Sequence, residues 1–472
     1  MHAERNRAES QKPAAPRTEP RREGARRKGA GRQDGRQSGA GAAGRRRGGG
    51  LLFVLVSIMA AGPLLNYGVS ASSALVVERL GINDGLLGSI VSVVFVSAAV
   101  TSLWLGRLAD RLSVRAQVAI VYGGSALALV VAAFAQQYAL LLVAAALVGP
   151  TQAIANPTTN RIILAEAPPG RKTSWIGVKQ SGVQASQLFA GLFFPAVALA
   201  FGWTGAALGA ACVTLLLWLI AEVVLGRAAG AAPSEGEASG RKVRGRRRQG
   251  RPDAAEKVRA PDAVKATTSS AGRGATRAAE RLPAEVWLTA AIAFLNGLGT
   301  QSTNVYLALF AVREVSFGVT AAGMAVAVAG VVGVVSRVMW GRRMDAGARP
   351  TTLLMIIGLG AIGSTVLLVL AGTLHQPALV WAAAAMHGIS ALGTNVVLNA
   401  FLLTLVPRER IGAASGVNSM GMFAGFSLGP IVMGAVLGAT GHFTVGWWVM
   451  GGLYACGILV VLVLRARVGG RA

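Results

Sequence analysis

Apolar runs of about twenty residues follow one another along most of the chain, and they constrain its fold more than any other feature. A helix needs about 20 apolar residues to cross a hydrocarbon core of roughly 30 Å, and helices satisfy their own backbone groups there. Twelve such runs can be counted, and they are 51–77, 85–105, 116–136, 138–164, 175–198, 202–225, 286–312, 319–340, 351–373, 377–406, 412–439 and 443–464. The sequence therefore predicts an all-α membrane protein with twelve transmembrane helices.

Composition agrees with this fold class and disfavours a catalytic function. Hydrophobic residues make up 53% of the 472 positions, and the mean hydropathy of +0.53 is far above that of a typical soluble domain. The chain contains no repeated Cys-x-x-Cys, no zinc-protease helix, no phosphate-binding P-loop and no hydrolase elbow. Two cysteines exclude a disulfide framework. We expect no enzymatic activity, no cofactor and no metal site.

Two long segments, 1–50 and 226–285, are rich in Arg, Ala and Gly and poor in large apolar residues. Such segments cannot bury enough apolar surface to offset the entropy of ordering, so both are predicted to be disordered. The first segment precedes the helical part of the chain, the second separates two helical regions, and a short tail at 466–472 follows them. The predicted organisation is an N-terminal bundle at 51–225 and a C-terminal bundle at 286–465.

The positive charges indicate the orientation in the membrane. With twelve spans, both termini and the linker lie on one side, and that side holds all of the 46 Lys and Arg except Arg79 and Arg313. Short loops on the cytoplasmic side of a membrane are enriched in Lys and Arg. We therefore expect a multi-pass protein of the cell membrane with both termini in the cytoplasm.

The chain has a formal net charge of +26, and its basic segments could bind an anionic partner. Anionic lipids of the inner leaflet attract such segments. Nucleic acid is the alternative, but no aromatic residues alternate with these arginines to stack on bases. The sequence favours membrane lipid and disfavours nucleic acid as the partner.

An internal repeat relates the two helical regions. At an offset of 239 residues, Asn156 and Asn160 align with Asn395 and Asn399, and other small residues of the flanking spans align as well. The repeat predicts two pseudo-symmetric six-helix bundles. Many secondary transporters have such repeats and bind substrate near the membrane midplane between them.

Side-chain amides are concentrated in a subset of the spans, at equivalent places in both halves. An unbonded polar group in an apolar medium costs about 2–7 kcal/mol, so these spans are expected to line a hydrated cavity. Hydrogen bonds that only join helices are the alternative for any single amide. The candidate substrate-binding residues are Asn66, Tyr67, Gln152, Asn156, Lys179, Gln184, Gln301, Asn304 and Asn395.

Ionisable side chains away from the span ends are few, and none of them is acidic. Lys179 could bind an anionic substrate, although its ammonium could instead extend to the headgroups. His387 could carry a coupling proton because an imidazole titrates near physiological pH, or it could be a hydrogen-bonded core residue. Arg337, just before a loop, is predicted to be structural.

The stretch "GRLADRLSVR" at 106–115 resembles the signature loop of the major facilitator superfamily, which lies between the second and third spans. Ser113 and Val114 depart from the family pattern. A second copy in the other half keeps Gly341 and Asp345. The resemblance covers about 51–465 and implies a secondary transporter with two six-helix halves.

In this family the signature loop acts as a conformational latch that stabilises the outward-open state. The resemblance assigns that role to Gly106, Asp110, Arg111 and Asp345. The Gly-Pro motif of drug:proton antiporters is not matched in the fifth run. That departure weakens the drug-export interpretation.

Three functions remain open from the sequence. We expect a secondary active or facilitative transporter of a small organic solute, with an anion among the options, that works by alternating access of its halves. Multidrug efflux by proton antiport is the second interpretation. A receptor or scaffold that transports nothing is the third, and it would not need polar side chains in both halves.

Overall fold

The computed structural model describes residues 34–168, 171–230, 282–407 and 410–469, with the side chains of 34–47, 103–104, 106–107, 109–110, 172–174 and 228–230 left aside. The chain divides between Gly48 and Gly49 into two units. The second unit contains the helical bundle, and both helical halves belong to it.

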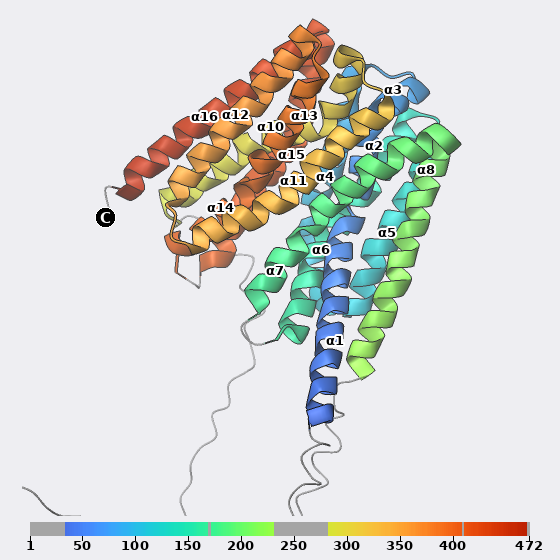
Figure 1. Cartoon of the computed structure of the whole chain (residues 1–472), viewed down its shortest axis with the longest axis vertical. Helices are drawn as coiled ribbons and strands as arrows, with labels where there is room; N and C mark the ends of the chain where they lie inside the picture. The colour runs from blue at the N-terminus through green and yellow to red at the C-terminus, as the bar shows by residue number, and fades with distance from the viewer. Residues whose placement is uncertain (1–33, 169–170, 231–281, 408–409, 470–472) are drawn as a thin grey trace, which may run out of the picture. The chain divides into compact units, whose positions relative to one another are not determined.

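The N-terminal half is entirely helical (Figure 1). Its elements are α1 (Asp34–Ala61), α2 (Leu64–Ala71), α3 (Ser73–Leu80), η2 (Asp84–Leu86), α4 (Leu87–Arg111), α5 (Val114–Ala133), α6 (Tyr138–Glu166), α7 (Lys172–Gln180) and α8 (Gly182–Gly230). One break follows from a glycine, since α8 contains Gly202 at φ 71° and ψ 172°, where the fifth and sixth predicted runs meet.

The C-terminal half follows the same pattern. Its elements are α10 (Ala284–Val315), α11 (Val319–Asp345), α12 (Pro350–Leu374), α13 (Pro377–Ile389), η3 (Ala391–Gly393), α14 (Thr394–Leu405), α15 (Ile411–Thr440) and α16 (Phe443–Gly469). Each apolar run predicted from the sequence overlaps at least one helix of its half, and the fifth and sixth runs share α8.

Nine helices in the described part of the chain are long and apolar enough to cross a membrane, or ten if the bent pair Gly48–Ala61 and Leu64–Ala71 counts as one span. The 53-residue segment Trp175–Arg227 counts once in that number, although it is broken at Gly202. Helix α10 is absent from the set, and its middle carries Asn296, Gln301 and Asn304. The all-α membrane fold is confirmed, while the number of twelve spans stays a prediction.

The disorder predicted for 1–50 and 226–285 is only partly within the described residues. Helix α1 begins at Asp34, within the first of these segments, and the disorder stays a prediction. Extending an existing helix is much easier than nucleating one, which explains how a membrane helix can continue into a Gly-rich segment. Helix α8 likewise runs to Gly230, and residues 231–281 lie outside the described ranges.

Glycines at equivalent positions of the repeat make the same contact in both halves. A methyl group on Gly182 would collide with the backbone carbonyl of Val56 in α1. In the other half, a methyl group on Gly421 would collide with the carbonyl of Ala290 in α10. Close backbone approach through small residues is typical of membrane helices. The two halves therefore share this packing as well as the sequence repeat.

The halves contact each other through four principal helices. Helix α4 packs on α15, and α8 packs on α11. Helix α10 of the second half also contacts α2 and α3 of the first. Figure 1 shows α10, α11 and α15, drawn in yellow to red, running next to α2, α4 and α8, drawn in blue to green.

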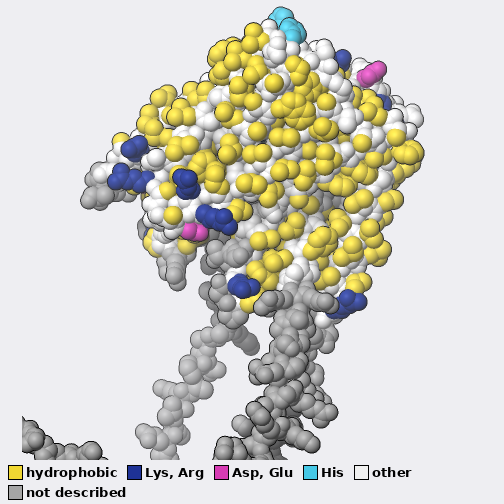
Figure 2. All heavy atoms as spheres, in the orientation of Figure 1, with side chains coloured by type: hydrophobic (Ala, Val, Ile, Leu, Met, Phe, Trp, Pro, Cys, Tyr) yellow, Lys and Arg dark blue, Asp and Glu magenta, His cyan; other side chains and the backbone are white. Residues whose placement is uncertain are grey.

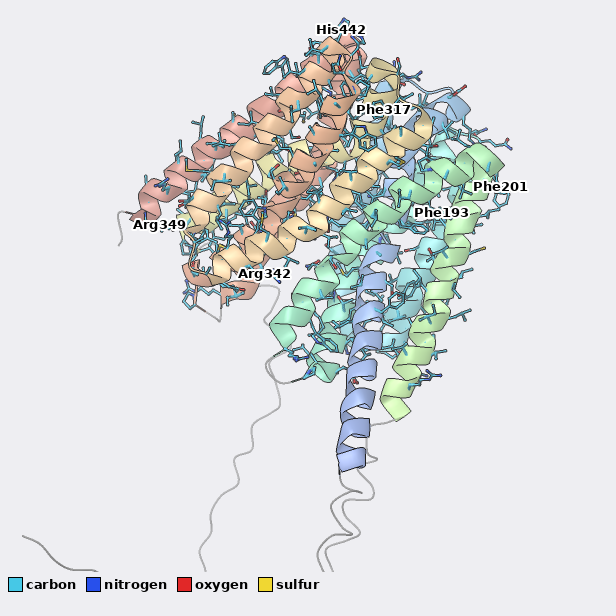
Figure 3. All side chains as sticks on the ribbon, in the orientation of Figure 1. Phe193, Phe201, Phe317, Arg342, Arg349 and His442 are labelled. Carbon is cyan, nitrogen blue, oxygen red and sulfur yellow. The ribbon has the colours of Figure 1, made fainter. Side chains whose placement is uncertain are left out.

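The two ends of the helical bundle differ in charge and in packing. The basic end carries Arg342 and Arg349, and the opposite end carries Phe317 and His442 (Figure 3). Figure 2 shows most Lys and Arg side chains of this face near the basic end, with a broad hydrophobic surface between the ends. We call the opposite end the closed end, because it is where η2 contacts α15 across the halves.

Candidate functional site

Lys179, near the end of α7, has its ammonium enclosed by side-chain oxygens of α6. Its Nζ donates to Asn160 Oδ1 at 2.6 Å, to Thr159 Oγ1 at 3.0 Å and to Asn156 Oδ1 at 3.3 Å. The residue is only 1% exposed. The ammonium therefore does not extend to the headgroups, and Asn156 and Asn160 serve to hold it.

The local sequence explains why α6 presents this group of oxygens. Asn156, Thr159 and Asn160 stand at i, i+3 and i+4, so they share one helix face. Pro157 lies inside the helix and removes one backbone donor. The hydroxyls of Thr158 and Thr159 donate back to the carbonyls four residues earlier at 2.8 Å, which leaves their oxygens able to accept a further bond.

A second cluster joins the halves through amides and an imidazole. Gln187 Nε2 of α8 donates to Asn304 Oδ1 of α10 at 3.2 Å. Asn304 Nδ2 donates to Gln301 Oε1 at 3.4 Å, and the same Oδ1 lies 3.2 Å from His387 Nε2 of α13. All four residues are at most 3% exposed. The structure thus brings Gln301, Asn304 and His387 together, with Gln187 from the other half.

Buried atoms without a partner border this cluster. Among the described residues, His387 Nδ1 and Gln187 Oε1 have no hydrogen-bond partner. Gln184 Oε1, one turn earlier on α8, has none either. Buried polar groups without partners are rare in native structures, so this part of the bundle has spare capacity to bond a solute or water. A coupling proton on His387 stays a prediction.

The remaining predicted residues lie apart from these clusters. Asn66 is buried and accepts a hydrogen bond from Gln152 Nε2 at 3.1 Å, which joins α2 to α6 within one half. Tyr67 beside it is also buried. Asn395 is half-buried near the start of α14. Asn66 and Gln152 therefore act as a helix-joining pair in this state, which is the structural alternative considered for single amides.

A break in the tenth predicted span leaves backbone carbonyls without helical partners, and side chains of α11 bond them. Ser336 Oγ donates to the Gly388 carbonyl at 2.8 Å, and Trp340 Nε1 donates to the Ile389 carbonyl at 2.7 Å. Arg337 Nε donates to the Leu392 carbonyl at 3.3 Å. The backbone around the α13–α14 break is therefore satisfied within the protein, as a membrane requires.

Arg337 also reaches the other half. Its Nη1 donates to the Gln180 carbonyl at 2.8 Å, at the interruption between α7 and α8. A guanidinium is well placed against the C-terminal end of a helix, where carbonyls point outward. Arg337 was expected to be structural, and these bonds show a structural role across the halves that the sequence did not indicate.

The closed end is sealed by backbone and by one tyrosine. Tyr306 Oη of α10 accepts from Gly88 N at 3.0 Å and donates to the Gly85 carbonyl at 3.1 Å. A methyl group on Gly88 would collide with the carbonyl of Pro430, and one on Gly434 with the carbonyl of Gly85. The two halves touch here at backbone distance, so water has no path between them at these positions.

An ion pair and an aromatic contact extend this seal. Arg313 Nε and Nη2 each lie 3.2 Å from a carboxylate oxygen of Asp84. Deeper along α4, the Phe95 ring is 5.3 Å from Phe426 and 6.4 Å from Phe423 of α15, measured between ring centroids. These contacts join the halves from the surface of the closed end inward.

None of the described glycines near the basic end contacts the backbone of the opposite half. A methyl group placed on Gly177 of α7 or on its repeat partner Gly416 of α15 would meet no atom within 4 Å. Arg111 and Asp345 of the predicted latch are exposed there, and the side chains of Gly106 and Asp110 lie outside the described ones. The latch therefore stays a prediction. No cluster of three or more metal-binding side chains occurs among the described residues.

Comparison with protein families identifies this architecture. A profile of the Major Facilitator Superfamily matches residues 50–342 and again residues 289–471, which together span nearly all of the helical region. The chain belongs to the major facilitator superfamily. The resemblance carried by the signature loop is thereby confirmed.

Solved structures of the superfamily share the fold at low sequence identity. A bacterial homologue of the human lysosomal transporter Spinster, inward-facing and unoccupied, aligns with a TM-score of 0.59 and 16% identity over 88% of this chain and 95% of that chain. A mutant of the nucleoside transporter NupG aligns with a TM-score of 0.65 and 15% identity over 88% and 99%. No curated protein sequence matches the chain. These relatives support membrane transport as the general function.

Several residues of the clusters were not among the sequence candidates. Gln187 and Thr159 complete the two groups, and Tyr306 and the Asp84–Arg313 pair complete the closed end. Gln187 carried a signal, because it shares a helix face with Gln184. The contacts of Tyr306 join residues more than 200 positions apart, and nothing local in the sequence indicates them.

Proposed function

We propose that this superfamily member is a secondary transporter that carries a small organic anion across the cell membrane by alternating access. The observation that supports an anion is Lys179. Its buried ammonium is held by neutral oxygens of Asn156, Thr159 and Asn160, and the ion pairs Arg115–Glu222 and Arg313–Asp84 do not include it. A charge inside a membrane protein costs several kcal/mol unless it is compensated, and a bound anion would supply the compensation.

Alternating access is supported by the asymmetry between the two ends. Backbone contacts between the halves close one end, while no described glycine near the other end makes such a contact. If the basic end is cytoplasmic, as the charge distribution indicates, this state would open to the cytoplasm. Transport would then require the closed end to separate and the basic end to close.

A neutral solute is the principal alternative, since one of the similar structures is a nucleoside transporter. The amides of Gln187, Gln301 and Asn304 would suit such a solute through hydrogen bonds. A neutral solute would leave the Lys179 charge uncompensated, however. Multidrug efflux by proton antiport has less support, because no acidic residue lies among the described contacts of either cluster.

Flux into proteoliposomes tests the proposal. The purified protein would be assayed with labelled monocarboxylates, dicarboxylates, nucleosides and cationic dyes, each with and without a pH gradient. We expect saturable anion uptake that falls at least about tenfold in Lys179→Gln, because a charge-assisted hydrogen bond contributes about 1.5–3 kcal/mol. Lys179→Arg should retain part of it.

The matched control is Arg467→Gln, which removes an exposed cation from the last turn of α16. It should leave anion uptake close to that of the unmodified protein. Saturable uptake of nucleosides or dyes without anion uptake would refute the anion assignment. Absence of any flux by well-folded protein would favour the receptor interpretation.

A further inference from the structure

Arg337 has more hydrogen-bonding capacity than its structural role uses. Its guanidinium has five N–H donors, and the structure engages two of them, one with the Leu392 carbonyl and one with the Gln180 carbonyl. Both partners are neutral, and the ion pairs Arg115–Glu222 and Arg313–Asp84 do not involve Arg337. The side chain is half-buried, and it lies in a membrane-spanning helix.

The structural role alone does not require a positive charge. Ser336 and Trp340, on either side of Arg337 in α11, bond the carbonyls of the same α13–α14 break with neutral groups. A glutamine or a second tryptophan could serve the Leu392 carbonyl without the cost of placing a guanidinium in the membrane. The charge therefore indicates a further ligand.

The position of Arg337 relates it to Lys179. Arg337 bonds Gln180, the residue next to Lys179 in the chain, and it comes from the opposite half. Gln184, one turn beyond Gln180, is 1% exposed and has an unpartnered Oε1. Gln184 packs against Gly333, which lies one turn before Arg337 in α11. A methyl group added to Gly333 would lie 3.1 Å from Gln184 Cγ. A cation from each half thus adjoins the α7–α8 interruption.

We propose that Arg337 is a specificity-determining residue that binds a second negative charge of the substrate, so that the transported solute is a dianion. This inference rests on the proposed function of organic-anion transport. Lys179 would bind one anionic group on the N-terminal half, and Arg337 would bind the other on the C-terminal half. The guanidinium fork suits a carboxylate or a phosphate, so dicarboxylates and phosphomonoesters share the required chemistry.

Competition with solutes matched in length tests the assignment. Uptake of labelled succinate into proteoliposomes at neutral pH would be competed with unlabelled succinate, butyrate and glycerol 3-phosphate. The unmodified protein should bind succinate at least tenfold more tightly than butyrate. Arg337→Gln should lower that ratio by about tenfold or more while leaving butyrate affinity nearly unchanged, and Arg337→Lys should restore part of the preference. Glycerol 3-phosphate distinguishes a phosphate from a second carboxylate as the preferred group.

Trp340→Phe is the matched control, because it removes a hydrogen bond to the same helix break without changing charge. It should keep the preference for the dianion. The inference is overturned if Arg337→Gln weakens butyrate and succinate by the same factor, or if the unmodified protein does not prefer succinate to butyrate. Absence of any anion uptake by the unmodified protein would instead contradict the proposed function. Failure of the dianion inference can therefore be distinguished from failure of the proposed function.

Discussion

The hydroxyl of Tyr306 offers a direct test of how the closed end is held together. The Tyr306→Phe substitution removes the acceptor of the Gly88 N–H and the donor to the Gly85 carbonyl, both of which belong to the other half. Gly88 is in the first turn of α4, where backbone N–H groups have no helical partner. The substitution therefore leaves a buried donor unsatisfied without creating a large cavity.

The expected magnitude follows from these two bonds. Leaving a buried donor unsatisfied costs about 1–3 kcal/mol. Because the bonds exist only while the halves touch, this cost applies to the closed state and not to a state in which they have separated. The ratio of closed to separated molecules should then fall by roughly 5–150-fold.

The distance between the halves can be measured with spin labels. Cysteines at Glu78 and Thr320, which are both exposed near the closed end, would carry the labels after the native exposed cysteines Cys212 and Cys456 are replaced by serine. Pulsed dipolar spectroscopy should show a short distance for the unmodified protein. It should show a larger share of long distances for Tyr306→Phe.

A tyrosine within one half supplies the control. Tyr138 bonds Ser89, the residue after Gly88, but both belong to the N-terminal half. Tyr138→Phe should leave the distance distribution unchanged, because this bond does not depend on the separation of the halves. An unchanged distribution in Tyr306→Phe, or an equal shift in both variants, would refute the argument.

Two further predictions concern glycine packing and the signature loop. Gly88→Ala should favour separation of the closed end and lower the melting temperature of the purified protein, because its methyl group would collide with the Pro430 carbonyl. Gly416→Ala, whose methyl group would meet no atom within 4 Å, should change neither property. Equal melting temperatures in the two variants would contradict this prediction. Asp110→Asn should slow substrate flux while the protein remains in the membrane, since the family latch depends on that carboxylate, and unchanged flux kinetics would count against the latch.

The sequence predicted the helical layout because the information is local. Each apolar run is long enough to specify a helix by itself, and the offset of 239 residues relates the halves without reference to any contact. Breaks inside spans were harder to predict. The interruption at Ser181 and the one after Ile389 depend on whether a side chain from another helix can bond the freed carbonyls.

The candidate site was predicted in part. The sequence identified Lys179 and Asn156 as members of one region, and the structure joins them by a hydrogen bond. It did not predict that Arg337 and Tyr306 bond the opposite half, because a contact between the halves leaves no local pattern in the sequence. Such contacts depend on how two bundles meet, and a periodic pattern within one helix carries no information about that.

The interrupted helix formed by α13 and α14 has a mechanical consequence. The carbonyls of Gly388, Ile389, Ala391 and Leu392 are all bonded by side chains of α10 and α11. These bonds replace the helical ones that the break removes, so no bare peptide group is presented to lipid. The two parts of the span are thus held by their neighbours and not by each other, and a displacement of α10 or α11 acts directly on the break.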